Sequence, residues 1–399
     1  MPGVFALALF WFLYFCALGV FYPYLTLYLH ENAGLDGTQV GIVLAVLPLV
    51  GIVAQPLWGN LADRTGARRG ILIVVTACAA AGYAVLGQAH GFGALVAATA
   101  LLAVFASAVV PLALSVTFAA LRSAHGFGRI RVWGTIGYLV TVAVFPWFLH
   151  RVAPVGHGAN EPGLAVMFPV TAVLAGAAAL IGAWLPRGGA VALRAARGRW
   201  RALLAEPAVV RLLLVSLAGH LFLQGPQGMF AILIRAHGGD IGTIGRMWVM
   251  MLLLEIPLVS LSGAGLTRLG ARALLTIGVL AGGVRWTACA LTDHVGVIYA
   301  VQLLHGVVVA GLLLGGPLYL ELVVPPNLRS TAQSLLGMLG VGVGGIVSNV
   351  AAGWLLEHAG PDAPFLAGGL GALVLGCAVA FILPAPAQAK PQMNTDDHR

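Results

Sequence analysis

The sequence predicts an all-α membrane protein whose twelve transmembrane helices form two six-helix, pseudo-symmetric bundles. Hydrophobic residues make up 60% of the 399 residues and charged residues only 9%, whereas soluble domains carry about 25% charged residues. Runs of about 20 apolar residues, long enough to cross a bilayer as helices, recur along the chain. In addition, one loop motif occurs twice at equivalent places. The polar surface is too small for a water-soluble body, so we expect the chain to lie in a lipid bilayer.

Twelve apolar runs are long enough to be membrane spans. The first run has no basic n-region and no small-residue cleavage site, and eleven more follow it, so we expect a retained helix rather than a signal peptide. The predicted spans are residues 4–29, 40–61, 70–88, 93–120, 130–149, 164–185, 208–234, 242–263, 272–291, 295–322, 330–355 and 364–384.

The basic residues are distributed unevenly across the predicted membrane. Seventeen of the 21 lie in the connections and ends on the side of the N-terminus, three (Arg151, Arg235 and Arg246) lie on the other side, and Arg285 lies within a span. Cytoplasmic loops carry such an excess of Lys and Arg. We therefore expect a multi-pass protein of the cytoplasmic (inner) membrane with both termini in the cytoplasm. The net charge of +8 then reflects topology and not a nucleic-acid partner.

The longest inner connection divides the chain into two halves. Residues 186–207 hold five arginines and separate an N-terminal six-helix bundle, 1–185, from a C-terminal one, 208–384. This basic linker either lies on the anionic inner leaflet or is an ordinary orienting loop. The proline-rich, polar tail, 385–399, is expected to be disordered in the cytoplasm.

The two halves repeat a loop motif 204 residues apart. "GNLADRTGARR" follows the second span and "GAGLTRLGAR" follows the eighth. Such a repeat is typical of a two-halved transporter whose substrate site lies at the midplane between the halves. The matching pairs are Gly59 and Gly263, Arg64 and Arg268, Gly66 and Gly270, Ala67 and Ala271, and Arg68 and Arg272.

The first copy, G-x-L-A-D-R-x-G-x-R-R, resembles the signature loop of the major facilitator superfamily. Its glycines allow a tight turn and close helix approach, and Asp63 can pair across to a neighbouring helix. In the second copy Thr267 stands where the acid would be. The resemblance implies a gating role for Gly59, Asp63, Arg64, Gly66 and Arg68.

Within the superfamily the chain resembles the phenylpropionate permease-like and the nucleoside or oligosaccharide:proton symporter (lactose permease-like) groups. The resemblance rests on "YPYLTLYL", "QPLWGNLADR", "FGRIRVWGTIGY", "LLEIP", "RW" and "QLLHG". It implies proton-coupled transport, with Glu255, Arg285 and His305 at the places of the coupling glutamate, arginine and histidine. Two acids of the pattern are missing, because Val308 replaces the acid after the histidine and "VVPLALSVTF" in span four is uncharged.

Glu255 is the one carboxylate placed deep in a predicted span. It lies 15 residues from Asp240 and 13 from Arg268, roughly 20 Å each way at about 1.5 Å per residue. An ionised group at mid-helix costs on the order of 3 kcal/mol or more. Glu255 must therefore be protonated, paired or facing water, and a proton-coupled carrier cycles through these states. The alternative is a static structural ion pair.

Arg285 and His305 each allow two interpretations. Arg285 either extends towards Asp293 and the outer interface, or is the counter-charge of Glu255 or the anchor of an anionic substrate. His305 is either a hydrogen-bonded core histidine or a partner in coupling, with Gln302 one turn earlier on the same face.

Two polar stripes are candidate substrate contacts. His220, Gln224 and Gln227 lie at i, i+4 and i+7 beside Gly225–Pro226. Freed backbone groups in a bilayer are tolerated only where protein or a water-filled cavity satisfies them. In span five, Arg131 and Tyr138 share one face. The resemblance makes Arg131 a substrate contact, and an interface anchor is the alternative.

The sequence contains no nucleotide-binding loop, no metal-ligand spacing and no nucleophile–base pair, so we expect no enzyme, cofactor or metal. We predict a monomeric, proton-coupled importer of a small organic solute. Two buried arginines favour an aromatic acid such as phenylpropionate, whereas the tyrosines and glutamines equally suit a sugar or nucleoside. A proton-driven exporter of drugs or metabolites and a non-transporting sensor or scaffold are the alternatives.

Overall fold

A computed structural model describes residues 2–121, 124–152, 163–186, 200–260 and 269–384. Most of the predicted linker at 186–207 and the whole tail at 385–399 lie outside these residues. Gly263, Thr267 and Arg268 of the second loop copy lie outside them too.

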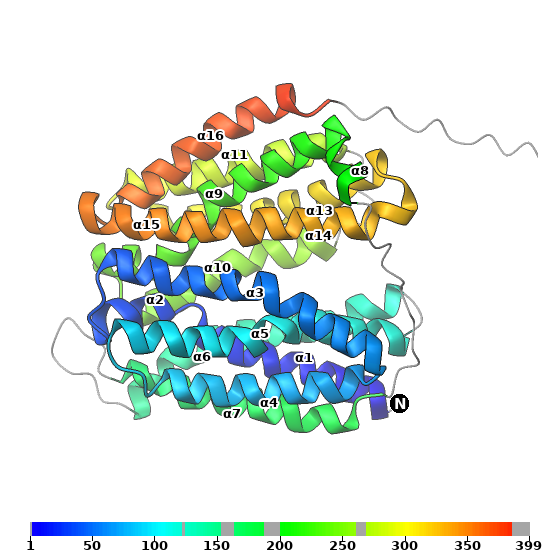
Figure 1. The fold of residues 1–399 in the computed structure, drawn as a ribbon. Helices are drawn as coiled ribbons and strands as arrows, with labels where there is room; N and C mark the ends of the chain where they lie inside the picture. The colour runs from blue at the N-terminus through cyan, green and yellow to red at the C-terminus, as the bar shows by residue number, and fades with distance from the viewer. Residues whose placement is uncertain (1, 122–123, 153–162, 187–199, 261–268, 385–399) are drawn as a thin grey trace, which may run out of the picture.

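The N-terminal bundle consists of α1–α7, at the bottom of Figure 1. Its first span is interrupted at Pro23 and continues as α2 and the π-helix η1, because proline breaks a helix. The elements are α1 (Pro2–Phe21), α2 (Leu25–Leu27), η1 (Tyr28–Asn32), α3 (Gly37–Thr65), α4 (Arg68–Leu86), α5 (Phe92–Leu121), α6 (Ala124–Val152), η2 (Leu164–Val166), α7 (Met167–Ile181) and η3 (Gly182–Trp184).

The C-terminal bundle consists of α9–α16, with the short helix α8 before it. The elements are α8 (Trp200–Leu204), α9 (Pro207–Ala236), α10 (Ile241–Ser260), α11 (Ala271–Ala290), α12 (Val295–Val301), α13 (Leu304–Val323), η6 (Pro326–Leu328), α14 (Arg329–Gly337), η7 (Met338–Gly344), α15 (Gly345–Ala359) and α16 (Ala363–Ile382).

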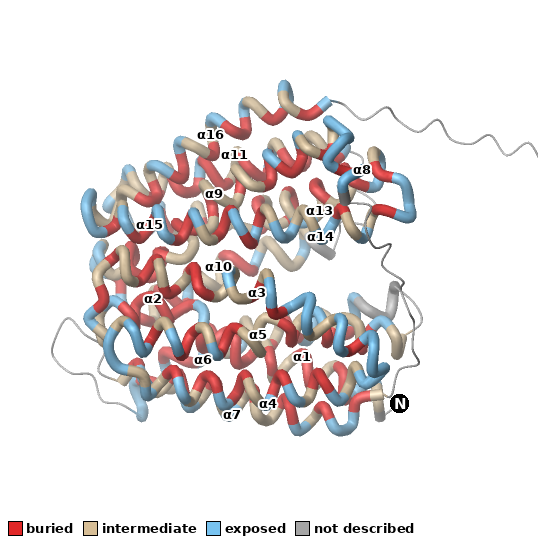
Figure 2. The backbone as a smooth tube through the Cα atoms, viewed as in Figure 1, coloured by how far each residue is buried: buried red, intermediate tan, exposed pale blue. Residues whose placement is uncertain are grey.

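Among the described residues, twelve helical segments are long and apolar enough to cross a membrane. They match the twelve predicted runs, so the all-α, twelve-span fold is confirmed. Large apolar side chains such as Val173, Leu180 and Phe381 are exposed on their outer faces, where lipid would cover them. Figure 2 shows the buried residues on the faces that the helices turn towards one another.

Local sequence sets where several helices begin and end. Asp36 caps α3 in a reciprocal capping box with Gln39. Asp240 caps α10 by accepting bonds from the Thr243 N–H and hydroxyl at 2.7 and 2.6 Å. Burial favours the neutral form of Asp240, but these bonds and nearby Arg246 outweigh it and lower the pKa of the carboxyl.

The two bundles meet along two pairs of helices. α3 packs against α15, and α6 packs against α10. These helices are spans 2 and 11 in the first pair and spans 5 and 8 in the second. Spans 2 and 8 occupy equivalent places in the two halves, and so do spans 5 and 11, so the two contacts are equivalent by the internal symmetry. Gly66 and Gly270 of the two loop copies both have positive φ angles, +67° and +82°, but their ψ angles of 0° and 149° differ. The symmetry of the helix pairs therefore agrees with the internal repeat, whereas the two loop glycines adopt different backbone conformations.

The turn between α3 and α4 marks one end of the molecule, which we call the motif end. Gly66 in the left-handed region closes α3, and Arg68 at the start of α4 bonds Asp63 at 2.7 Å. The Arg69 side chain donates to the Leu185 carbonyl at 2.9 Å. Pro2 and the last turn of α16 also lie at this end (Figure 1).

At the opposite end, which we call the far end, the bundles are in close contact. The Arg235 Nε lies 2.8 Å from the Glu31 carboxylate of the other bundle, and the Thr38 N–H donates to Glu357 at 3.0 Å. Between these contacts α3 and α15 cross through small residues. A Cβ added at Gly41 would lie 2.4 Å from the Asn349 carbonyl oxygen. The far end is therefore closed, and its closure depends on glycine.

We predict that Gly41→Ala opens the far end. The added methyl meets backbone that cannot move aside alone, and overpacking of this kind costs about 1–3 kcal/mol, or a roughly 5- to 150-fold shift of a conformational equilibrium. With the four native cysteines replaced, a cysteine at Leu47 in the cavity wall should react faster with an impermeant maleimide added from the far side.

Gly176→Ala is the matched control, because its added Cβ has only the Ala80 Cβ at 3.9 Å as a neighbour. Equal labelling rates in the two variants would contradict the proposed dependence on glycine.

Candidate functional site

A cavity of about 1250 Å³ lies between the two bundles. Its wall includes Tyr138 from α6, Gln224 and Gln227 from α9, and Trp248 from α10. The wall continues to Asp63 at the motif end. Since the far end is closed by direct contacts, the cavity is accessible from the motif end.

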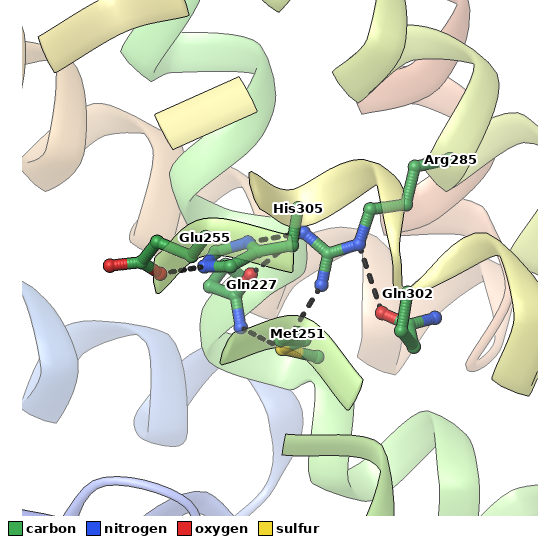
Figure 3. A network of polar contacts seen from close by, with 6 residues as sticks. All are labelled: Gln227, Met251, Glu255, Arg285, Gln302 and His305. Carbon is green, nitrogen blue, oxygen red and sulfur yellow. Dashed lines mark hydrogen bonds and ion pairs between the residues drawn. The ribbon is translucent and has the colours of Figure 1, made fainter. Parts of the chain in front are cut away.

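Arg285 lies at the centre of a chain of polar contacts (Figure 3). Its Nε donates to Gln302 Oε1 at 2.9 Å, and its Nη1 lies 3.0 Å from both Gln227 Oε1 and His305 Nδ1. The guanidinium also covers the ring of Trp286 at 3.8 Å. Arg285 is only 1% exposed, so protein contacts replace water around this charge.

His305 lies between Arg285 and Glu255. Arginine has no acceptor, so His305 Nδ1 must accept from Arg285, and the ring hydrogen is then on Nε2. Nε2 faces Glu255 Oε2 at 3.6 Å, as Figure 3 shows. A second proton on Nδ1 would break the bond with Arg285. The arrangement therefore favours a neutral histidine that connects the carboxylate to the guanidinium.

The three predicted coupling residues are thus brought together, but Glu255 and Arg285 do not pair directly. The interpretation that Arg285 extends to the outer interface is not supported by the structure. Asp293 instead lies 3.6 Å from His237 Nδ1. Glu255 is a quarter exposed, but it is not among the described residues that line the cavity.

Arg131 approaches Glu255 from the other bundle. Its guanidinium lies over the rings of Phe15 and Trp11 at 4.3 and 5.0 Å, and its charge interacts electrostatically with Glu255. Among the described residues, its buried Nη1 has no hydrogen-bond partner. Arg131 thus has an unused buried donor beside aromatic rings of its own bundle, and it is not among the described residues that line the cavity.

The remaining predicted substrate contacts divide into three groups. Tyr138, Gln224 and Gln227 line the cavity. Gln302 is fully buried behind it and holds Arg285. His220 is absent from the described cavity wall, and its Nδ1 lies 2.8 Å from the Ser216 carbonyl in its own helix.

Gln302 lies at a break in span ten that the sequence did not predict. The backbone N–H of Gln302 bonds Tyr299, one residue short of the regular helical partner. The Gln302 Nε2 donates instead to the Ile298 carbonyl at 2.7 Å. The side chain therefore satisfies the carbonyl that the break leaves free, as a membrane interior requires.

α9 continues without a break through Gly225 and Pro226, although the sequence predicted a loosened helix there. The N–H of Gly225 donates to the Ser348 hydroxyl on α15 at 2.6 Å. A polar side chain of another span thus satisfies a backbone donor at the weakened point of α9.

Trp248 lies in the cavity wall and was not among the residues predicted from the sequence. Its ring centroid is 5.9 Å from that of Tyr138 on the other bundle. Its buried Nε1 has no partner among the described residues, and the same holds for Ser107 Oγ in the same wall. A signal was present, because Trp248, Met251 and Glu255 lie at i, i+3 and i+7 on one helix face.

The described residues contain no group of three or more His, Cys, Asp or Glu that could hold a metal ion. Cys16, Cys78, Cys289 and Cys377 are free thiols.

Comparison with known proteins gives consistent results. The model of the MFS_1 like family matches residues 4–367. The maltose permease of Geobacillus stearothermophilus is 31% identical over 363 residues, which are 88% of this chain and 87% of that protein. A probable 3-phenylpropionic acid transporter of Escherichia coli K12 is 27% identical over 317 residues, 75% and 77% of the two chains.

The fold is also that of solved transporters. The crystal structure of a point mutant of the nucleoside transporter NupG superimposes with a TM-score of 0.86 at 18% identity, covering 96% of this chain and 100% of that one. On the family match and the similarity to maltose permease, the chain belongs to the MFS_1-like family of the major facilitator superfamily, whose members are transporters and not enzymes.

Proposed function

We propose that the protein imports a neutral, hydroxyl-rich solute, a sugar or a nucleoside, together with protons across the cytoplasmic membrane. The observation that carries this proposal is the set of uncharged polar groups in a largely apolar cavity wall. It presents amide, hydroxyl and indole groups, and its one charged lining residue among those described, Asp63, is an acid at the motif end.

Hydroxyl groups of a sugar both donate and accept, and so do the amides of Gln224, Gln227 and Asn349. The tilted ring pair of Tyr138 and Trp248 provides apolar faces for the ring of a solute. Sites of this kind combine a few placed polar groups with aromatic walls.

The buried arginine that would suit an anion is already engaged. Arg285 directs its donors to Gln227, Gln302, His305 and the Met251 sulfur. An anionic substrate would have to displace these partners. This favours the neutral solute over the aromatic acid that the sequence alone favoured. The similarity to maltose permease supports the same direction.

Proton coupling is proposed from the place of Glu255. Its carboxylate lies between the His305 ring of its own bundle and the charge of Arg131 on the other. Movement of the bundles changes the distance to Arg131 and the access of water. Both changes alter whether Glu255 holds a proton, so rocking of the halves would load and release it.

We infer from the excess of arginine, under the positive-inside rule, that the motif end lies in the cytoplasm. The structure then corresponds to an inward-open state, with a closed outer side. In this proposal the Asp63–Arg68 turn acts as a gating latch that engages when the cavity opens outward. Arg64 and Gly59 would belong to that latch.

An aromatic carboxylate is the second candidate, and one observation favours it. The unpaired Nη1 of Arg131, beside Trp11 and Phe15, offers a cation with aromatic neighbours. The similarity to a probable 3-phenylpropionic acid transporter points the same way.

We predict that Glu255→Gln abolishes accumulation but permits exchange of substrate across the membrane. The amide cannot carry the proton, while the cavity is retained. Uptake of labelled solute under an imposed proton gradient, compared with equilibrium exchange in the same vesicles, measures this. Glu321→Gln is the matched control, because Glu321 is an exposed glutamate outside the polar chain. Undiminished accumulation by Glu255→Gln would refute proton coupling at this residue.

We predict that maltose or nucleosides, and not phenylpropionate, raise the thermal stability of the purified protein. A ligand at 100 times its Kd stabilises the folded state by about 2.7 kcal/mol. Stabilisation by phenylpropionate that disappears in Arg131→Gln would instead establish the second candidate.

A further inference from the structure

Gln227 belongs to both the cavity wall and the polar chain. Its side chain lines the cavity, and its Oε1 accepts from Arg285 Nη1 at 3.0 Å. Figure 3 shows the amide between Arg285 and Met251. A group in this position can contact a bound solute and the Arg285 guanidinium at the same time.

The contact with Arg285 is not interchangeable with others. Arg285 Nη1 carries two hydrogens, and the two acceptors beside it are Gln227 Oε1 and His305 Nδ1. At 1% exposure the guanidinium has no water to replace a lost acceptor. A change in the orientation of the Gln227 amide therefore changes the position of Nη1, and with it the bond to His305.

The other end of the amide is weakly held. Gln227 Nε2 has the Met251 sulfur at 3.8 Å as its described partner, and a thioether is a weak acceptor. A hydroxyl or carbonyl oxygen of a solute in the cavity is a better one. Binding of such an oxygen would rotate or shift the amide towards the cavity.

No other described residue has both contacts. Gln224 lines the cavity, but it packs against Gly345 and has no bond to the polar chain among the described residues. Gln302 holds Arg285 at 2.9 Å but is fully buried and is not part of the wall. Among the described residues, Gln227 alone both lines the cavity and hydrogen-bonds Arg285.

We propose that Gln227 is the positioning residue through which an occupied cavity controls the proton on Glu255, acting by way of Arg285 and His305. The inference rests on the proposed function, since it requires a proton-coupled solute. The solute class follows from the amide, which recognises a neutral oxygen that accepts a hydrogen bond.

The groups that face Glu255 define what the link acts on. His305 lies 3.6 Å away on α13, and α6 of the other bundle brings the charge of Arg131 and the neutral phenol of Tyr138 near it. When a solute holds the Gln227 amide, Arg285 and His305 adjust together. This adjustment moves His305, the partner of Glu255 on the same bundle, and leaves Arg131 and Tyr138 of the other bundle in place.

The link has a measurable consequence for binding. If the solute prefers the protonated carrier, its affinity falls as pH rises through the titration of Glu255, and proton affinity rises when solute binds, by the same factor. Coupling between two sites is typically about 5- to 150-fold. A change of this size in Kd with pH is expected for the unaltered protein.

The test uses Gln227→Met in the full-length protein, with maltose or a nucleoside as probe, whichever raises the thermal stability of the unaltered protein. Methionine has similar length but cannot hold Arg285 or donate to a solute. We expect weaker binding and a Kd that varies less than about threefold with pH, which is below the usual range of coupling between sites. Exchange should persist, while the ratio of accumulation to exchange should fall roughly tenfold or more, a factor within that range.

Gln224→Met is the matched control. It removes an amide from the same wall without touching Arg285, so it should weaken binding by the same factor at every pH and keep the ratio of accumulation to exchange. Suppose that the Kd of Gln227→Met keeps its full dependence on pH and Glu255→Gln still cannot accumulate solute. That result would overturn the role of Gln227 but not the proposed function. Accumulation by Glu255→Gln would overturn the proposed function itself.

Gln227→Glu covers the case in which the methionine variant does not fold. A carboxylate keeps an acceptor on Arg285, so the buried cation stays paired and the fold is maintained. It holds Arg285 whether or not solute is present, so the ratio of accumulation to exchange should again fall. An unchanged ratio in Gln227→Glu would contradict the inference.

Discussion

The buried guanidinium of Arg285 is the constraint on which the site depends. An arginine cannot shed its charge, and a charge without partners inside a bundle is strongly destabilising. Gln227 from α9, Gln302 from the break in span ten and His305 from α13 provide its partners. One charge on α11 thereby fixes the side chains of two neighbouring spans and orients the ring that faces Glu255.

A second constraint comes from glycine at the contact between the bundles. Gly41 and Gly353 bring α3 and α15 so close that a single methyl group would strike backbone. Close packing of small residues replaces the hydrophobic driving force that helices in lipid lack. The same contact closes the far end and leaves the cavity accessible from the motif end. In a rocking mechanism these small residues allow the two halves to separate without losing large interlocked side chains.

Much of the fold was predictable from sequence, because apolar length indicates the spans and the repeated loop indicates the two halves, although neither shows which helices pair. The candidate site was predictable only in part. The family resemblance indicated Glu255, Arg285 and His305, but spacing along a chain does not show that the histidine lies between the other two. The break at Gln302 depends on a side chain replacing a backbone donor, which no periodicity reveals. Trp248 was missed since an aromatic residue in an apolar run is ordinarily a packing residue.

The central claim is that a neutral solute and a proton cross together. The most direct measurement is the pH of a weakly buffered suspension of de-energised cells that contain the protein, after solute is added outside at high concentration. Solute entering down its own gradient should carry protons with it, so we expect a transient rise in external pH that a proton conductor abolishes. Solute entry with no change in external pH would contradict the proposed cotransport of solute and protons.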